Sequence, residues 1–248
     1  MARINAKGHL SGAVGPVYFR ILNGKPIVQS KPGKGNVKQA AATKAGASEF
    51  GAASKTAKCI RAALFPILQD LADVTMFQRF TAAVYAAVRA NTTVTKGNRR
   101  LADGDLSLLE GFEFNHNSPF AKYSSLSPQI TCLPDGKLAI SLADTASAEA
   151  FKIPHPKASG TELRVMVTVV DPHSGMFVND ERFSVSISGS STVVPAQAWT
   201  TAILPAGHLV FVTMALRYYR EDRSAGNIPL NSRELHPCRM VRAFLTGE

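Results

Sequence analysis

Cysteine is scarce in this chain of 248 residues, and its three copies lie far apart in the sequence. They stand at Cys59, Cys132 and Cys238, none of them in a CxxC pair, and their number is odd. A disulfide framework needs paired cysteines and a zinc site needs closely spaced ligands, so this pattern argues against both. We expect buried thiols that pack as small apolar side chains, with a single thiol at an interface as the alternative.

Long apolar runs are also missing. The stretch from Leu209 to Leu216 is among the longest and is interrupted by Thr213, whereas a membrane-spanning helix needs about 20 apolar residues. The first ten residues are followed by neither the apolar run nor the cleavage-site pattern of a signal peptide. We therefore expect no signal peptide and no membrane anchor, and a location in the cytoplasm or in a virion.

Known catalytic motifs are absent. The chain has no GxSxG elbow, Walker loop or dinucleotide turn, and Gly33-Lys-Gly35 matches a phosphate loop only in composition. Six histidines are scattered, without HExxH or HxH spacing. Asp171-Pro-His173 and Asp180-Glu181 are the best places to seek an acid, a base or a metal ligand, but turn residues explain both more simply. We expect no enzyme activity, no metal and no cofactor.

Acidic residues are rare in the first part of the chain, which gives this part a strongly positive net charge. Residues 1–100 contain 16 Lys or Arg and three acidic residues, a net charge of +13, whereas residues 101–248 have a net charge of −3. A segment of this kind is attracted to polyanions, with counterion release as the driving force. Nucleic acid is the obvious partner, although an acidic protein or a neighbouring subunit would serve equally, and a solvated basic face is the simplest alternative.

The candidate contact residues for a nucleic acid or other polyanion are Arg3, Lys7, Arg20, Lys25, Lys31, Lys34, Lys38, Lys96, Arg99 and Arg100. Aromatic rings stand beside arginines in Tyr18-Phe-Arg20 and Tyr218-Tyr-Arg220, where they could stack on bases. Alternation along a strand, however, predicts that one ring of each pair lies in the core.

The segment from Val14 to Ser30 predicts a β-hairpin. Branched and aromatic residues flank Asn23-Gly24, a dipeptide that suits the positive φ angles of a tight hairpin turn. Pro26 has no N–H to donate to a neighbouring strand, so its strand should lie at a sheet edge. An exposed edge invites pairing with another chain.

Two helices are expected next. Apolar residues recur at intervals of three and four from about Val37 to Leu64, with an interruption near Gly46 or Gly51. Pro66 fits a kink or the first turn of a second helix that runs to about Ala90. The second helix has an apolar stripe of Leu68, Leu71, Met76, Phe80, Val84 and Val88. Packing of two ordinary helices on each other already explains this stripe.

A polar stretch from Asn91 to Asp105 separates the helical pattern from a β pattern. We place a domain boundary there, between a basic hairpin and helical region, 1–100, and a β domain, 101–248. Within the stretch, Lys96, Arg99 and Arg100 lie beside Gly97. Because Gly and Asn let backbone N–H groups converge, this cluster could hold a phosphate, although a solvated loop is the simpler interpretation.

Beyond this boundary the hydrophobic period changes to two. Segments 129–133 and 137–142 flank the turn Pro134-Asp-Gly136, and segments 163–169 and 183–187 alternate as half-buried strands do. About seven short strands predict an antiparallel, immunoglobulin-like β-sandwich, although the Cys…Trp…Cys framework is absent. With the hairpin and the two helices, the predicted fold class is α+β.

Four short motifs mark the first 65 residues: Ser11-Gly-Ala-Val-Gly15, the turn Asn23-Gly-Lys25, the exit Ser30-Lys-Pro32, and a helix rich in Gln, Ala and Lys. By these motifs the chain resembles a family of uncharacterised proteins common in Bacteroidetes, in which a basic Ser-Gly-x-Val-Gly hairpin and helices precede a β-rich C-terminal region. Lys31 departs from the family pattern, where Arg is usual. The resemblance implies this architecture and no catalytic residues.

These observations favour a non-enzymatic structural or assembly protein, such as a subunit of a virus-like, phage-derived or tail-like particle. A basic arm suits an anionic interior, and an open hairpin edge suits contacts between copies, so we expect a homo-oligomer. The alternative is a sequence-independent nucleic-acid-binding protein that acts as a monomer or small oligomer. A third hypothesis is a hydrolase or lectin-like module that uses the sandwich loops.

Overall fold

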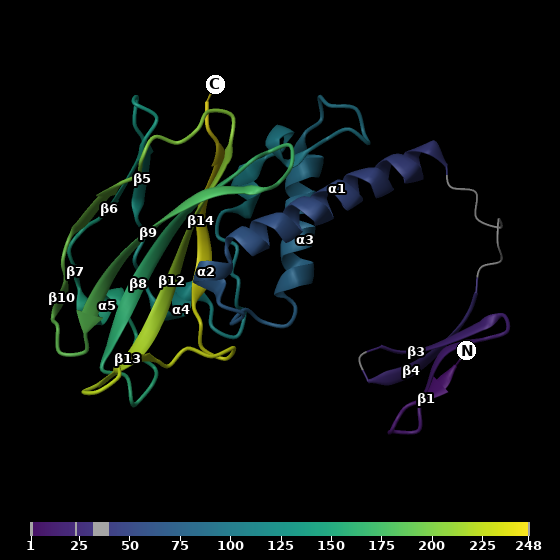
Figure 1. Cartoon of the computed structure of the whole chain (residues 1–248), viewed down its shortest axis with the longest axis horizontal. Helices are drawn as coiled ribbons and strands as arrows, with labels where there is room; N and C mark the ends of the chain where they lie inside the picture. The colour runs from purple at the N-terminus through teal and green to yellow at the C-terminus, as the bar shows by residue number, and fades with distance from the viewer. Residues whose placement is uncertain (1, 23, 32–39, 248) are drawn as a thin grey trace. The chain divides into compact units, whose positions relative to one another are not determined.

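The computed structural model describes residues 2–22, 24–31 and 40–247 and shows an α+β protein with antiparallel sheets (Figure 1). Contacts divide the chain into two compact units, Met1–Lys44 and Ala45–Glu248. We call them the N-terminal unit and the body.

The N-terminal unit is an antiparallel sheet in the order β1-β2-β3-β4. Its strands are β1 (Arg3–Ile4), β2 (Leu10–Val14), β3 (Val17–Leu22) and β4 (Lys25–Ser30). The predicted hairpin is confirmed as β3 and β4, and Gly24 in its turn has a φ of +77°; Asn23 lies outside the described residues. Pro26 lies on β4 at the sheet edge, as its missing N–H predicts. Strands β1 and β2 were not predicted.

Three helices follow the N-terminal sheet in the sequence: α1 (Ala41–Ala63), α2 (Phe65–Leu68) and α3 (Met76–Ala90). The interruption expected near Gly46 or Gly51 is wrong, because α1 is continuous. The expectation of one helix from Pro66 to Ala90 is also wrong. Gln69 and Asp70, with φ angles of 50° and 57°, end α2 in the left-handed region, so α3 must begin anew.

Two antiparallel sheets form the rest of the body. The larger has the order β13-β12-β8-β9, with β14 also paired to β12, and the smaller has the order β11-β6-β5. The strands of the larger sheet are β8 (Gly160–Val170), β9 (Phe177–Ser188), β12 (Leu209–Asp222), β13 (Gly226–Pro229) and β14 (Cys238–Leu245). Those of the smaller are β5 (Gln129–Cys132), β6 (Leu138–Leu142) and β11 (Gln197–Thr200). The predicted hairpin at Gly136 is confirmed as β5 and β6.

Short elements connect the helices and sheets. The body also contains the 3₁₀ turns η1 (Leu101–Asp103) and η2 (Leu106–Leu109), the helical turns α4 (Phe120–Tyr123) and α5 (Ser147–Ala150), and the paired strands β7 (Thr145–Ala146) and β10 (Val193–Val194).

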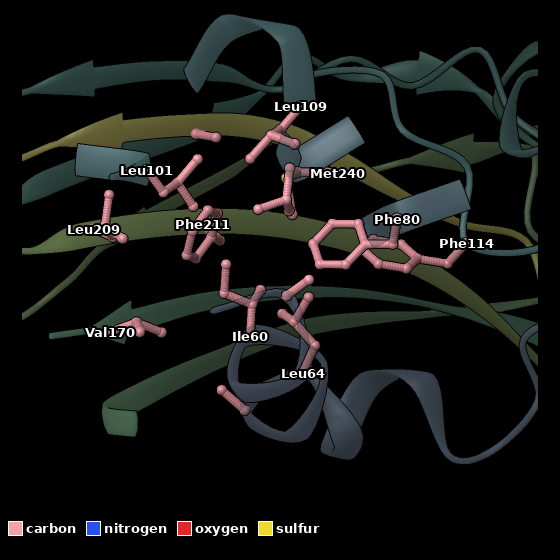
Figure 2. Close-up of a cluster of buried hydrophobic side chains, with 14 of the residues drawn as sticks. Ile60, Leu64, Phe80, Leu101, Leu109, Phe114, Val170, Leu209, Phe211 and Met240 are labelled. Carbon is pink, nitrogen blue, oxygen red and sulfur yellow. The ribbon is translucent and has the colours of Figure 1, made fainter. Parts of the chain in front are cut away.

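The helices cover one face of the larger sheet. Figure 2 shows the resulting core, in which side chains of α1 and α3 meet those of the central strands. This cluster includes Ile60, Leu64, Phe80, Val170, Phe211 and Met240. The stripe predicted for α3 therefore packs on the sheet as well as on α1. The division between compact units falls at Lys44, and not near residue 100, because this shared core ties the helices to the β region.

The smaller sheet contributes to a second core on the opposite face of the larger one. Leu138 and Ile140 of β6 belong to the same buried cluster as Val165 and Val167 of β8. Since β8 is covered on both faces, all of its residues from Val165 to Val170 are buried. The expectation of a half-buried strand is therefore wrong there, whereas it is confirmed in β9, where exposed serines alternate with buried aliphatic residues.

Candidate polyanion interface

The register of the N-terminal unit sorts its side chains onto two faces. In β3 and β4, Tyr18 pairs with Gln29, Arg20 with Ile27, and Leu22 with Lys25. Paired residues point to the same side of a sheet. Arg20 and Lys25 therefore share one face with Tyr18, Leu22, Ile27 and Gln29, and we call this the basic face after its two cations.

The two cations of the basic face are exposed among the described residues of the N-terminal unit and could contact a partner. Arg20 and Lys25 are both exposed, and they are diagonal neighbours across β3 and β4, a relation that places β-carbons roughly 7 Å apart. Tyr18 is 38% exposed, so its ring is accessible beside Arg20. Two cations and an aromatic ring on one surface can contact phosphate and stack on a base.

The other predicted contact residues of the N-terminal unit are spread along its strands and loops. Arg3 on β1, Lys7 in the following turn and Lys31 after β4 are all exposed. Lys34 and Lys38 lie outside the described residues. The unit thus brings together Arg20 and Lys25, and the contacts of all these residues with a polyanion stay predictions.

The Lys96-to-Arg100 loop of the body has a different arrangement. The carboxylate of Glu49, which is 1% exposed on α1, accepts a hydrogen bond from the Gly97 N–H at 2.7 Å. Arg99 Nε lies 3.6 Å from the same oxygen. The backbone donor and cation that could have held a phosphate are therefore occupied by an internal carboxylate. Lys96 and Arg100 remain exposed.

The second aromatic pair is unavailable for stacking. The expectation that one ring of Tyr218-Tyr219 would leave the core is wrong, because both tyrosines are buried. The Tyr218 hydroxyl donates to the Lys152 carbonyl at 3.2 Å, and the Tyr219 hydroxyl donates to the Ile187 carbonyl at 3.4 Å. Burial raises the pKa of Tyr218 well above its usual value.

The residues considered for catalysis have structural partners. Asp171 accepts hydrogen bonds from the backbone N–H groups of His173 and Ser174, which lower its pKa together with the Ser174 hydroxyl. Asp180 pairs with Arg182, and Glu181 accepts from the Ala202 N–H at 2.8 Å. The contacts of Asp171 are those of a turn. The expectation of turn residues is wrong for Asp180 and Glu181, which lie within β9 and pair with Thr168 and Val167 of β8.

Within residues 2–22, 24–31 and 40–247, no cluster of three or more His, Cys, Asp or Glu side chains could hold a metal ion. No helix in the described part of the chain is long and apolar enough to cross a membrane. Of the cysteines, Cys238 is buried as expected, Cys59 is half-buried, and Cys132 is exposed, contrary to the expectation of buried thiols.

The sequence pattern did not indicate a hollowed surface around Phe65 on the body. Three hollows, of about 430, 630 and 530 Å³, are each lined by Phe65 of α2. Phe65 is 54% exposed, and exposed Phe77 and Met176 line the adjoining hollows. Helical periodicity predicted one continuous helix here and could not indicate this surface, which forms around the separate short helix α2.

Comparisons with models of protein families, with curated proteins and with solved structures found no match to this chain. The resemblance to the Bacteroidetes family is neither supported nor contradicted and stays a prediction.

Proposed function

We propose that this protein is a non-enzymatic assembly subunit, of the kind that builds a virion-like, phage-derived or tail-like particle, and that its N-terminal unit contacts a polyanion. The observation that carries the proposal is the charge of that unit. Residues 1–44 contain eight Lys or Arg and no acidic residue. When such cations neutralise the phosphates of a nucleic acid, the counterions condensed on those phosphates are released, and this release drives association.

The division of the chain supports separate roles for its parts. The body has two extensive hydrophobic cores and can act as the building block. The N-terminal unit has no buried residue among those described, and its exposed cations are carried on a sheet of its own. A small, exposed sheet of this kind suits contact with partners better than it suits independent stability.

An immunoglobulin-like sandwich in the body is a further part of the proposal. Its support is the cluster shared by the smaller and larger antiparallel sheets. Helices on the outer face of the larger sheet would then be an addition to the sandwich. We assign the helix-covered body to contacts between subunits.

Light scattering on the purified full-length protein tests the assembly role directly. We expect particles larger than a monomer at high concentration, and co-purifying nucleic acid visible in the ultraviolet absorbance ratio. A protein that stays monomeric across concentration and salt, with a pure protein spectrum, contradicts the proposal.

Sequence-independent binding of nucleic acid without assembly is the second candidate. It is favoured by the exposed Tyr18 ring beside Arg20 on the basic face, a pairing that stacks on bases of any identity. A monomeric protein that binds single strands with a steep salt dependence would decide for this candidate.

A further inference from the structure

Two arginines are neighbours on the helix-covered face of the larger sheet. Arg164 of β8 pairs with Ser184 of β9, and the next pair on the same face joins Met166 to Arg182. Arg164 and Arg182 are therefore diagonal neighbours, a relation that places their β-carbons roughly 7 Å apart. Met166 belongs to the core that the helices share with this sheet, so both arginines point to the side of the helices.

Each arginine is held by an acid that stands two residues before it on the same strand. Glu162 Oε2 accepts from Arg164 Nε at 3.0 Å, and Asp180 Oδ2 accepts from Arg182 Nε at 2.5 Å. The register puts the two acids at the outer positions of this row and the two arginines between them. The acids thus orient the guanidinium groups from outside and leave the space between the arginines positive.

The two guanidinium groups keep donors for a ligand. One terminal nitrogen of Arg164 lies 2.9 Å from Glu162 Oε2. Its other terminal nitrogen, and both of Arg182, form no hydrogen bond within the described part of the chain. Glu162 is also shared with a third cation, because Arg217 Nη1 lies 3.6 Å from the same oxygen. Three arginines therefore face two acids, and this surplus favours an anion.

A hollow of about 430 Å³ lies beside this pair of cations. Both arginines line it, together with Ser184, Gln69, and Phe65 and Pro66 of α2. Its volume is that of a small-molecule site, in which apolar walls surround a few convergent polar groups. Guanidinium groups bind the two oxygens of a carboxylate or phosphate with parallel hydrogen bonds, which suits such an anion in this hollow.

A second hollow of about 630 Å³ adjoins the first and is lined mainly by apolar residues. Phe65, Pro66 and Arg182 line both hollows, so the cationic and apolar linings meet at these residues. Along the second hollow lie Met176 and Phe177, which are 67% and 49% exposed. Exposed apolar side chains gathered beside polar ones are typical of a binding surface.

We propose that the two hollows bind a small amphipathic anion. Its carboxylate or phosphate head lies between Arg164 and Arg182, and its hydrocarbon tail lies along Phe65 and Met176. The surplus of arginines determines the charge of the head, and the adjoining apolar lining determines the tail. This site lies in the body, so the proposal goes beyond the assembly function and does not depend on the N-terminal unit.

Titration of the full-length protein with octyl phosphate and with octanoate, followed by NMR of the ligand, tests the head of the site. Each guanidinium supplies hydrogen bonds to a charged group, so Arg182→Gln should weaken binding of both probes at least about tenfold. The matched control is Arg242→Gln, because Arg242 is an exposed arginine held by Glu110 and lines none of the hollows around Phe65. This control should bind as the wild type does.

Chain length tests the tail. From butyl to octyl phosphate, each added methylene that enters the second hollow should strengthen binding up to about fourfold. Inorganic phosphate should bind most weakly. Arg20→Ala with Lys25→Ala should bind octyl phosphate as the wild type does, which separates this site from contacts of the basic face with a polyanion.

Equal affinity of the wild type and Arg182→Gln, or an affinity that does not change with chain length, overturns the proposal. Binding to vesicles that contain an anionic phospholipid, without binding of octyl phosphate in solution, also overturns it. Thermal unfolding verifies the fold of each variant, and Arg182 is 62% exposed. Should its variant not fold, Met176→Ser replaces it and should weaken binding of octyl phosphate but not of inorganic phosphate. Each of these outcomes leaves the assembly role intact.

Discussion

His236 should make the stability of the body depend on pH in the mildly acidic range. Its ring is buried, with Nε2 3.0 Å from the Ile67 carbonyl and Nδ1 3.0 Å from the side-chain nitrogen of Asn231. Because the carbonyl can only accept, Nε2 carries the proton and Nδ1 accepts from the amide. The neutral ring is thus fully hydrogen-bonded. Burial, with a smaller contribution from Arg164, lowers the pKa of His236 to about 4.

The pKa values set the size and sign of the effect. Lowering the pKa of His236 from 6.5 to about 4 corresponds to about 3 kcal/mol of folding free energy. The unfolded chain binds a proton first as pH falls, since its histidine has the higher pKa. The stabilising contribution of neutral His236 is therefore complete above pH 6.5 and is lost as pH falls from 6.5 through 4.

The assay is urea unfolding of the wild type and of His236→Gln at a series of pH values between neutral and about 4. Glutamine does not titrate, and the shifts of Asp73 and Glu113 cancel when the two proteins are compared. We expect the free energy of unfolding of the wild type, relative to the variant, to fall by about 3 kcal/mol over this range. A difference that stays constant with pH would refute the reasoning.

Three further predictions concern thermal unfolding. Glu49→Ala leaves the Gly97 N–H and the Arg99 guanidinium without their buried acceptor and should lower the free energy of unfolding by about 3 kcal/mol. An unchanged Tm would contradict this role of Glu49. Gly104→Ala places a β-carbon 2.4 Å from a carbonyl oxygen and should cost about 2 kcal/mol, whereas Gly51→Ala in an open helical position should gain up to about 1 kcal/mol. Thr213→Val removes a buried hydroxyl that has no partner in the described part of the chain and should gain about 1 kcal/mol, whereas Thr201→Val loses two hydrogen bonds and should destabilise. The reverse order of the two threonine variants would contradict it.

Local sequence determined the elements that could be predicted. The hairpin of β3 and β4 follows from Asn23-Gly24 and branched flanking residues, and the edge position of β4 follows from Pro26. The turn at Gly136 likewise identified β5 and β6. In each case the signal lies within a few residues and does not depend on what packs nearby.

Contacts between distant segments determined the rest. Tyr218 is buried in the core shared with the smaller sheet, whereas Tyr219 is buried over Gly160 of β8, with its hydroxyl on the Ile187 carbonyl of β9, and alternation alone cannot reveal either contact. The local sequence around Glu49 likewise does not reveal that its carboxylate binds the N–H of Gly97, 48 residues away. Of the candidate contact residues, register across β3 and β4 was needed to show that Arg20 and Lys25 share a face.

The central claim is that the basic face of the N-terminal unit contacts a polyanion, and its most direct test is the salt dependence of binding to a short DNA duplex. Each lost phosphate contact lowers the slope of log affinity against log salt by about 0.9, so Arg20→Ala with Lys25→Ala should lower it by about 1.8. The control pair Lys157→Ala with Arg223→Ala, exposed on the body, should leave the slope unchanged. Equal slopes for the wild type and the basic-face variant, or binding that does not respond to salt, would contradict the account.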